Sequence, residues 1–221
     1  MKKLTLTDGI GFVVWLLPAA YLLMLYPSLP DTVPVHFGAD GQPDRYGDRS
    51  EFLLIVLMLM GVSAIMYLLL KFLPSIDPKR TAKYSKPVFR QLAFVLLLFM
   101  SVLNLVIMYA TTHGSLKVEK LVFPLLGVLF TYLGNIMHSL KPNYFVGIRT
   151  PWTLESENTW RKTHQLAGKI WLPGGLIITL LSLLLPTETA VVVFMITVFV
   201  MIIIPVIYSY LYYKKHSVQQ P

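Results

Sequence analysis

Six residues suited to molecular recognition lie close together in one polar segment of the chain. The segment runs from Gly147 to Gly168, and the six residues are Arg149, Trp152, Glu157, Trp160, Arg161 and His164. Arginine makes bidentate contacts to carboxylates, tryptophan offers a large rigid contact face, and Glu157 stands one helical turn before Arg161, where the two can pair. The pattern predicts a working surface for a partner, and we call residues 147–168 the signature segment.

A second polar set lies in the segment from Leu29 to Ser50, where His36, Asp40, Asp44 and Asp48 recur every four residues. One imidazole and three carboxylates could bind a divalent cation, but their spacing does not fit an EF-hand loop. Turn formation and solvation are the default interpretation, and a cation site is the alternative. We expect His36, Asp40, Asp44 and Arg45 to be the recognition residues of this segment.

A third set of polar residues falls inside apolar stretches. Thr131, Asn135 and His138 follow Gly127 on one helical stripe, and Asn104 lies in the preceding stretch with Ser101. In a membrane such a stripe should face other helices, where interhelical hydrogen bonds form, and Ser101 and Asn104 are candidate partners. A structural role is expected. A polar pathway that relays protons is the alternative.

Several classes of function are excluded by missing motifs. The chain contains no cysteine, zinc-protease motif, phosphate-binding loop, dinucleotide fingerprint or nucleophile elbow. The expected spans also contain no Asp or Glu that could form a catalytic dyad. We therefore expect neither an enzyme nor a cofactor. The net charge of +8 lies beside apolar stretches rather than in a compact basic domain, so we expect membrane lipids as partners and no direct binding of nucleic acid.

The composition is that of a membrane protein, with 55% hydrophobic residues, 14% charged residues and a mean hydropathy of +0.64. A bilayer core of about 30 Å needs roughly 20 helical residues. Six stretches reach that length, so we expect an all-α integral membrane protein with six transmembrane helices in a single domain, residues 1–221. The stretches are approximately Gly9 to Tyr26, Phe52 to Leu73, Gln91 to Ala110, Leu121 to Leu140, Lys169 to Leu185 and Ala190 to Tyr213.

Local signals predict three smaller features. A short helix is predicted between transmembrane helices 4 and 5, with Pro151 at its start, Thr153 as its cap and Gly168 at its end. This helix is expected either to lie along the cytoplasmic membrane surface or to pack under the bundle. Pro173, followed by two glycines, predicts either an interruption of helix 5, as in transporters, or a kink. Val33 to Phe37 predicts a strand, and Asp40-Gly41 predicts a turn.

The distribution of cations predicts the orientation in the membrane. With both termini in the cytoplasm, the inner segments hold 15 of the 19 Lys and Arg residues, six of them between Lys71 and Arg90. The outer segments hold only four cations, so the loop from Leu29 to Ser50 is expected outside.

Two sequence blocks resemble one bacterial family. The run GIRTPWTL, followed by WRKTH and AG, resembles the signature of the SdpI family of toxin-immunity membrane proteins, and LPDTVPVHFGADGQPDRYGDRS resembles the family's N-terminal domain of unknown function. Residues 9–73, with outer loop 27–51, would be that domain, and residues 121–213 the SdpI-type region. The resemblance implies a multi-pass protein of the bacterial plasma membrane that protects against a secreted peptide toxin and signals through a sequestered cytoplasmic repressor. A transporter or exporter of a small solute or peptide is the alternative.

The orientation can be tested with single cysteines in this cysteine-free chain. We expect an impermeant thiol reagent to label Asp40→Cys, but not Lys83→Cys, in intact cells, because the charge asymmetry puts position 40 outside and position 83 inside. Labelling after the cells are permeabilised is the control for access. Labelling of position 83 alone in intact cells would show the reverse orientation.

Overall fold

The computed structural model describes residues 5–38, 41–76, 86–114 and 117–217. Asp40 and Lys83 therefore lie outside the described residues. The described elements are seven α-helices, one 3-10 helix and two strands, in the order α1 (Leu6–Leu25), η1 (Tyr26–Ser28), β1 (Thr32–Phe37), β2 (Pro43–Asp48), α2 (Arg49–Ile76), α3 (Lys86–His113), α4 (Val118–Met137), α5 (Pro151–Glu155), α6 (Glu157–Leu184) and α7 (Thr187–Ser217).

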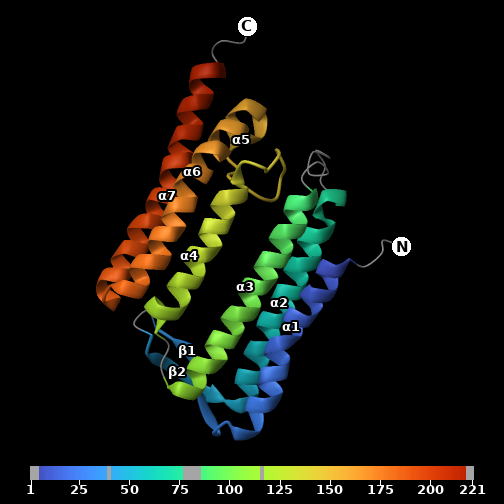
Figure 1. The fold of residues 1–221 in the computed structure, drawn as a ribbon, viewed down its shortest axis with the longest axis vertical. Helices are drawn as coiled ribbons and strands as arrows, with labels where there is room; N and C mark the ends of the chain where they lie inside the picture. Colours follow the sequence, from blue (N-terminus) through green and yellow to red (C-terminus); the bar gives the residue numbers. More distant parts are fainter. Residues whose placement is uncertain (1–4, 39–40, 77–85, 115–116, 218–221) are drawn as a thin grey trace. The chain divides into compact units, whose positions relative to one another are not determined.

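The predicted fold class is confirmed. Six of the described helices are long and apolar enough to cross a membrane, namely α1, α2, α3, α4, α6 and α7. Which side of the membrane holds the termini stays a prediction. The helices form two compact units, one built from residues 1–71 and 91–122 and the other from residues 72–90 and 123–221. We call them the amino-terminal and carboxy-terminal units (Figure 1).

In the amino-terminal unit, α1, α2 and α3 lie side by side (Figure 1) and are joined by hydrogen bonds as well as by apolar packing. The Trp15 indole N–H donates to the Met60 carbonyl at 3.0 Å, and the Asn104 amide donates to the Val56 carbonyl at 3.3 Å. Phe52 and Val56 are fully buried in the core beneath them. Because polar groups without partners are costly in lipid, these bonds define which helix faces meet.

Between α1 and α2 the chain forms an antiparallel β-hairpin, in which β1 pairs with β2. The predicted first strand is confirmed, and Gly41, with φ 75°, turns the chain as expected. The sequence did not predict β2, because Pro43–Asp48 is polar and lacks the apolar alternation of a half-buried strand. It pairs at the exposed edge, while Val33 and Pro34 of β1 are buried and Thr111 of α3 donates to the Pro34 carbonyl.

In the carboxy-terminal unit, α4 and α6 approach each other closely at four glycines. These are Gly127 and Gly134 on α4, and Gly168 and Gly175 on α6, and the members of each pair are seven positions apart. A Cβ added to Gly134 would overlap the backbone of Leu172, and one added to Gly127 would lie 2.7 Å from the Gly175 carbonyl. We call these four residues the glycine seam. Small residues allow this approach, which maximises van der Waals contact between helices in lipid.

Helix α6 differs from the prediction at Gly168. It begins at Glu157 and runs without a break to Leu184, so Gly168 does not end a helix. Of the two alternatives at Pro173-Gly174-Gly175, the interruption is not the one formed. Gly168 instead serves the seam, where any side chain would push α4 away. The short helix between α4 and α6 is α5, which ends at Glu155 and is capped by Thr150, not by Thr153.

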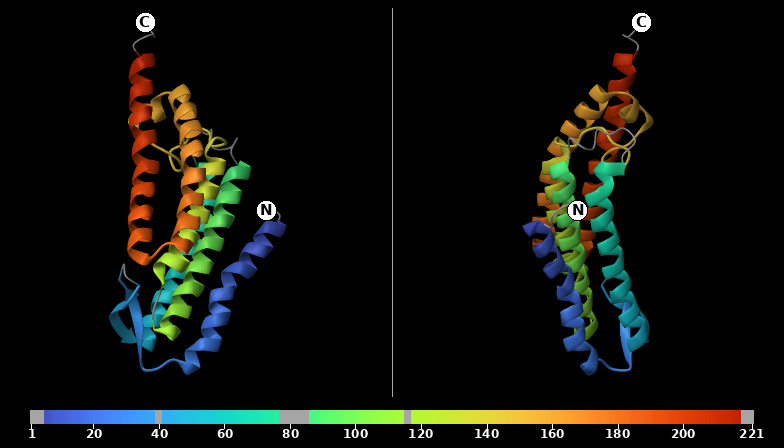
Figure 2. Two further views of the ribbon diagram at one scale, coloured as in Figure 1. Left: turned by 60° about the vertical axis from the view of Figure 1, so that its left-hand side comes forward. Right: turned by 90° about the vertical axis from the view of Figure 1, so that its right-hand side faces the viewer.

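Proline places a hydrogen-bond acceptor on α7. Pro205 has no N–H to donate to the Met201 carbonyl, four residues before it in the helix. The Trp171 indole N–H of α6 donates to that carbonyl at 2.8 Å. Helix α7 lies along α6 (Figure 2). The two helices are joined through a carbonyl of α7 that accepts no hydrogen bond from Pro205.

The glycine seam predicts an asymmetric response to alanine. Gly134→Ala should lower the stability of the detergent-solubilised protein by about 1–3 kcal/mol, because the added methyl group forces two backbones apart. Gly61→Ala is the matched control, since a Cβ at Gly61 meets nothing within 4 Å. Alanine favours helix over glycine by about 0.5–1 kcal/mol, so the control should be neutral or stabilised. Equal thermal midpoints for the two variants would show that the helices do not meet at Gly134.

Candidate functional site

The loop between α4 and α5 is ordered by one buried asparagine. The Asn143 side chain accepts hydrogen bonds from the backbone N–H groups of Phe145 and Val146, and it donates to the carbonyls of Lys141 and Val146. Asn143 is completely buried. Its amide therefore satisfies backbone groups that have no partner in a helix or strand, and it shapes the approach to the signature segment.

His164 joins this loop to α6 through both of its ring nitrogens. The Ile148 backbone N–H donates to Nε2 at 3.0 Å, so Nε2 is an acceptor. Nδ1 must then carry the proton, which it donates to the Trp160 carbonyl at 2.8 Å. Gly147 makes room for the ring, since its φ is 115° and any Cβ there would overlap Nε2. The buried imidazole thus acts as a neutral link with both nitrogens engaged.

Trp160 stacks on the same ring and reaches the end of α4. Its ring centroid lies 4.1 Å from that of His164, and its indole N–H donates to the Leu140 carbonyl at 2.8 Å. Trp160, Ala167 and Leu140 belong to one buried cluster. Of the two positions expected for the helix of the signature segment, Trp160 shows the one in which it packs against the bundle.

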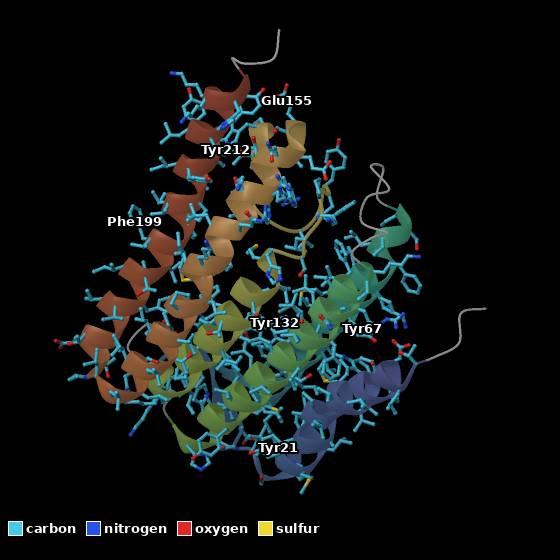
Figure 3. The ribbon with its side chains drawn as sticks, turned by 45° about the horizontal axis from the view of Figure 1, so that its top comes forward. Tyr21, Tyr67, Tyr132, Glu155, Phe199 and Tyr212 are labelled. Carbon is cyan, nitrogen blue, oxygen red and sulfur yellow. The ribbon has the colours of Figure 1, made fainter. Side chains whose placement is uncertain are left out.

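Helix α5 connects the start of α6 to the end of α7. The Trp152 indole N–H donates to the Ser209 hydroxyl at 2.5 Å, and its ring packs edge-on against Tyr210. The Tyr213 hydroxyl donates to a Glu155 carboxylate oxygen at 2.7 Å. Figure 3 shows Glu155 and Tyr212 at the same end of the carboxy-terminal unit. Two residues of a five-residue helix thus hold the last turns of α7.

The expected working surface divides into a buried and an exposed part. Trp160 and His164 are each 1% exposed, so the expectation that they offer contact area to a partner is wrong. Both are buried because Trp160 packs against the end of α4 and His164 against the loop that follows it. Trp152 is half-buried against α7, whereas the exposed members of the set are Arg149, Glu157 and Arg161.

The two arginines have neighbours that the sequence did not indicate. Arg161 donates to the Asn158 side chain at 2.8 Å, three residues away, and so the expected pairing with Glu157 is not the contact formed. Arg149 donates to the Tyr144 carbonyl. Each guanidinium uses one of its five N–H groups in this contact, which leaves donors of both available at the surface.

The recognition residues expected in the hairpin are exposed and partly paired. His36 Nδ1 lies 2.6 Å from an Asp44 carboxylate oxygen, and Arg45 pairs with Glu51. Asp48 accepts the Glu51 backbone N–H at 2.7 Å and so caps α2. Among the described residues, no three His, Asp or Glu side chains gather closely enough to hold a metal ion. Asp40, the fourth expected ligand, lies outside those residues.

The polar residues expected within the membrane have separate roles. Asn104 contacts α2, as described above, and Thr131 donates to the Gly127 carbonyl on its own helix at 2.9 Å. The Gly127 and Thr131 part of the stripe faces another helix, as predicted, and that helix is α6. Asn135 and His138 are exposed at the end of α4 and line a groove.

A charged cluster in the amino-terminal unit was not predicted from the sequence. Asp8 accepts hydrogen bonds from the Tyr67 hydroxyl at 2.6 Å and from Lys71 Nζ at 2.8 Å, and its side chain is 7% exposed. The first span was expected to start after Asp8 and to lack acidic residues, whereas α1 starts at Leu6. The Thr5-x-x-Asp8 capping box was the signal that could have revealed it.

Comparison with known proteins matches both regions. Residues 139–209 match the SdpI/YfhL protein family, and residues 13–61 match a domain of unknown function, DUF1648. Over 215 residues the chain is 24% identical to the Immunity protein SdpI of Bacillus subtilis. The aligned region covers 97% of this chain and 98% of that protein. The resemblance to the SdpI family is confirmed.

The SdpI-type match covers the site described above. It begins at Ser139, just after α4, and ends at Ser209, the residue that receives the Trp152 indole. An uncharacterized protein of Archaeoglobus fulgidus is 42% identical over 59 residues, which is 27% of this chain and 30% of that protein. No solved structure matches the chain.

The link through His164 predicts a structural phenotype. His164→Phe keeps a ring against Trp160 but leaves the Ile148 N–H without its acceptor, which should cost about 1–3 kcal/mol. We expect a lower thermal midpoint in detergent and lower membrane abundance. His216→Phe, at an exposed position at the end of α7, is the control and should change neither. A normal midpoint for His164→Phe would mean that the link does not hold the loop.

Proposed function

We propose that this chain is an immunity protein that protects a bacterial cell from a secreted antimicrobial peptide. The observation that carries the proposal is the similarity to the Immunity protein SdpI across nearly the full length of both chains, which includes both family regions. The protein acts as a multi-pass protein of the plasma membrane. It acts by binding: it captures the toxin at the outer face of the membrane or blocks the toxin's insertion there.

The hairpin is the proposed capture surface. Its side chains offer donors, acceptors and an aromatic face, with His36, Asp44 and Arg45 exposed and Tyr46 58% exposed. Ion pairs restrain these side chains: His36 pairs with Asp44, and Arg45 pairs with Glu51. Arg49 and Asp31, which flank the hairpin, form a further pair at 2.7 Å. A restrained surface loses less side-chain entropy on binding, which favours recognition of a peptide. The charge distribution that predicts an outer location for this loop supports the same assignment.

The exposed charged residues of the signature segment form the proposed signalling surface. Arg149, Glu157 and Arg161 stand on a base fixed by the His164 link and by the contacts of α5 with α7. Such a fixed base keeps the arginine donors at defined positions, where they can meet carboxylates of a partner. The proposed partner is a cytoplasmic transcriptional repressor, held at the membrane while toxin is bound.

A survival assay tests the proposal. A sensitive strain challenged with secreted antimicrobial peptides should survive when it produces this protein, and Tyr46→Ala should reduce survival without lowering membrane abundance, because an exposed side chain adds little to stability. Arg161→Glu should leave abundance and insertion intact but abolish a repressor-controlled reporter response, since it reverses the charge of the contact surface.

Lys162→Glu makes the same charge change at the next exposed position of α6 and is the control for Arg161→Glu. It should retain the reporter response. If the protein is abundant and confers no survival against any peptide tested, the immunity function is refuted. If Arg161→Glu signals normally, only the signalling surface is refuted.

A further inference from the structure

A groove of about 620 Å³ lies beside the glycine seam in the carboxy-terminal unit. Gly134 and Gly168 form part of its wall, so the close approach of α4 and α6 shapes it. Four polar side chains also line it: Asn135 and His138 from the end of α4, and Gln165 and Lys169 from α6. Its lining includes none of the exposed residues Arg149, Glu157 and Arg161 and no residue of the hairpin.

The four polar side chains share one chemistry, which is hydrogen-bond donation. Lys169 contributes an ammonium group, Asn135 and Gln165 contribute amide NH₂ groups, and His138 contributes a ring N–H. None of the four forms a side-chain hydrogen bond or ion pair with the part of the chain that the structure describes, and no carboxylate lines the groove. Converging donors with one fixed positive charge suit an anion that has several acceptor oxygens.

The remaining wall is apolar and leads toward the membrane-spanning part of α6. Leu172 and Pro173 form it, one helical turn beyond Lys169. Pro173 has no N–H to donate to the Lys169 carbonyl, so this groove residue also offers a backbone acceptor that the helix does not use. A ligand that fits has an anionic head, a hydroxyl or similar donor, and an apolar tail.

We propose that this groove binds the headgroup of an anionic phospholipid through its phosphate. Lys169 and His138 contact the phosphate oxygens, the amides of Asn135 and Gln165 donate to the remaining acceptors, and the acyl chains pass over Leu172 and Pro173. Basic sites between transmembrane helices at the level of the headgroups are suited to such lipids. A soluble phosphate ester shares the head but gains nothing from the apolar wall.

Native mass spectrometry of the delipidated full-length protein with phosphatidylglycerol tests the site. The double variant Lys169→Gln with His138→Gln should bind about tenfold more weakly than the original protein, the loss expected for a charge-assisted hydrogen bond. Phosphatidylcholine with the same acyl chains has the same phosphate but no net negative charge, so it should bind the original protein more weakly than phosphatidylglycerol does. Lys162→Gln, which removes a cation of α6 outside the groove, is the control and should bind phosphatidylglycerol normally.

Three results would overturn the proposal. The first is unchanged affinity for phosphatidylglycerol in the double variant, or in Lys169→Gln alone if the double variant does not purify as a folded protein. The second is an equal loss in Lys162→Gln, which would show attraction to surface charge rather than a site. The third is displacement of the lipid by glycerol phosphate at concentrations near the lipid's own dissociation constant, which would identify a site for soluble phosphate esters.

Discussion

The close approach of two backbones at the glycine seam is the constraint on which the carboxy-terminal unit depends. Lipid gives no hydrophobic reward for bringing helices together, so α4 and α6 must gain contact by shape. With Gly127 and Gly134 facing Gly168 and Gly175, the end of α4 is held against the middle of α6. The chain after α4 must therefore turn back beside the first turns of α6, which is where Asn143, Gly147 and His164 order it.

This arrangement changes the meaning of the signature segment. Its most distinctive residues, Trp160 and His164, are buried and attach α6 to the preceding loop and to the end of α4. The residues around them that face solvent are charged side chains. The residues of the signature segment thus attach a loop to a helix, in addition to any contact that the segment makes with a partner. Any signalling role has to act through the exposed Arg149, Glu157 and Arg161, whose positions depend on the buried pair.

Much of the fold could be predicted from the sequence, because six apolar runs of sufficient length have few alternatives in a membrane. The strand from Val33 was likewise marked by its residues. The error within α6 came from glycine, whose local role depends on neighbours that a sequence does not show. Gly168 looks like a helix end and is instead a packing contact. The charged residues were harder, since Asp8 is paired with Lys71 across 63 positions.

The two contacts that hold α7 fix the number of residues between them as well as the position of the helix. Trp171 binds the Met201 carbonyl and Trp152 binds the Ser209 hydroxyl, at two points on one continuous helix. Adding or deleting one residue between them would move Ser209 about 1.5 Å along the axis and turn it by about 100°. Substitutions at the exposed positions between the two anchors can be accommodated by lipid, whereas replacement of Pro205, insertions and deletions cannot. Related sequences should therefore vary in residue type at those exposed positions while keeping Pro205 and the spacing of eight positions between the two anchors.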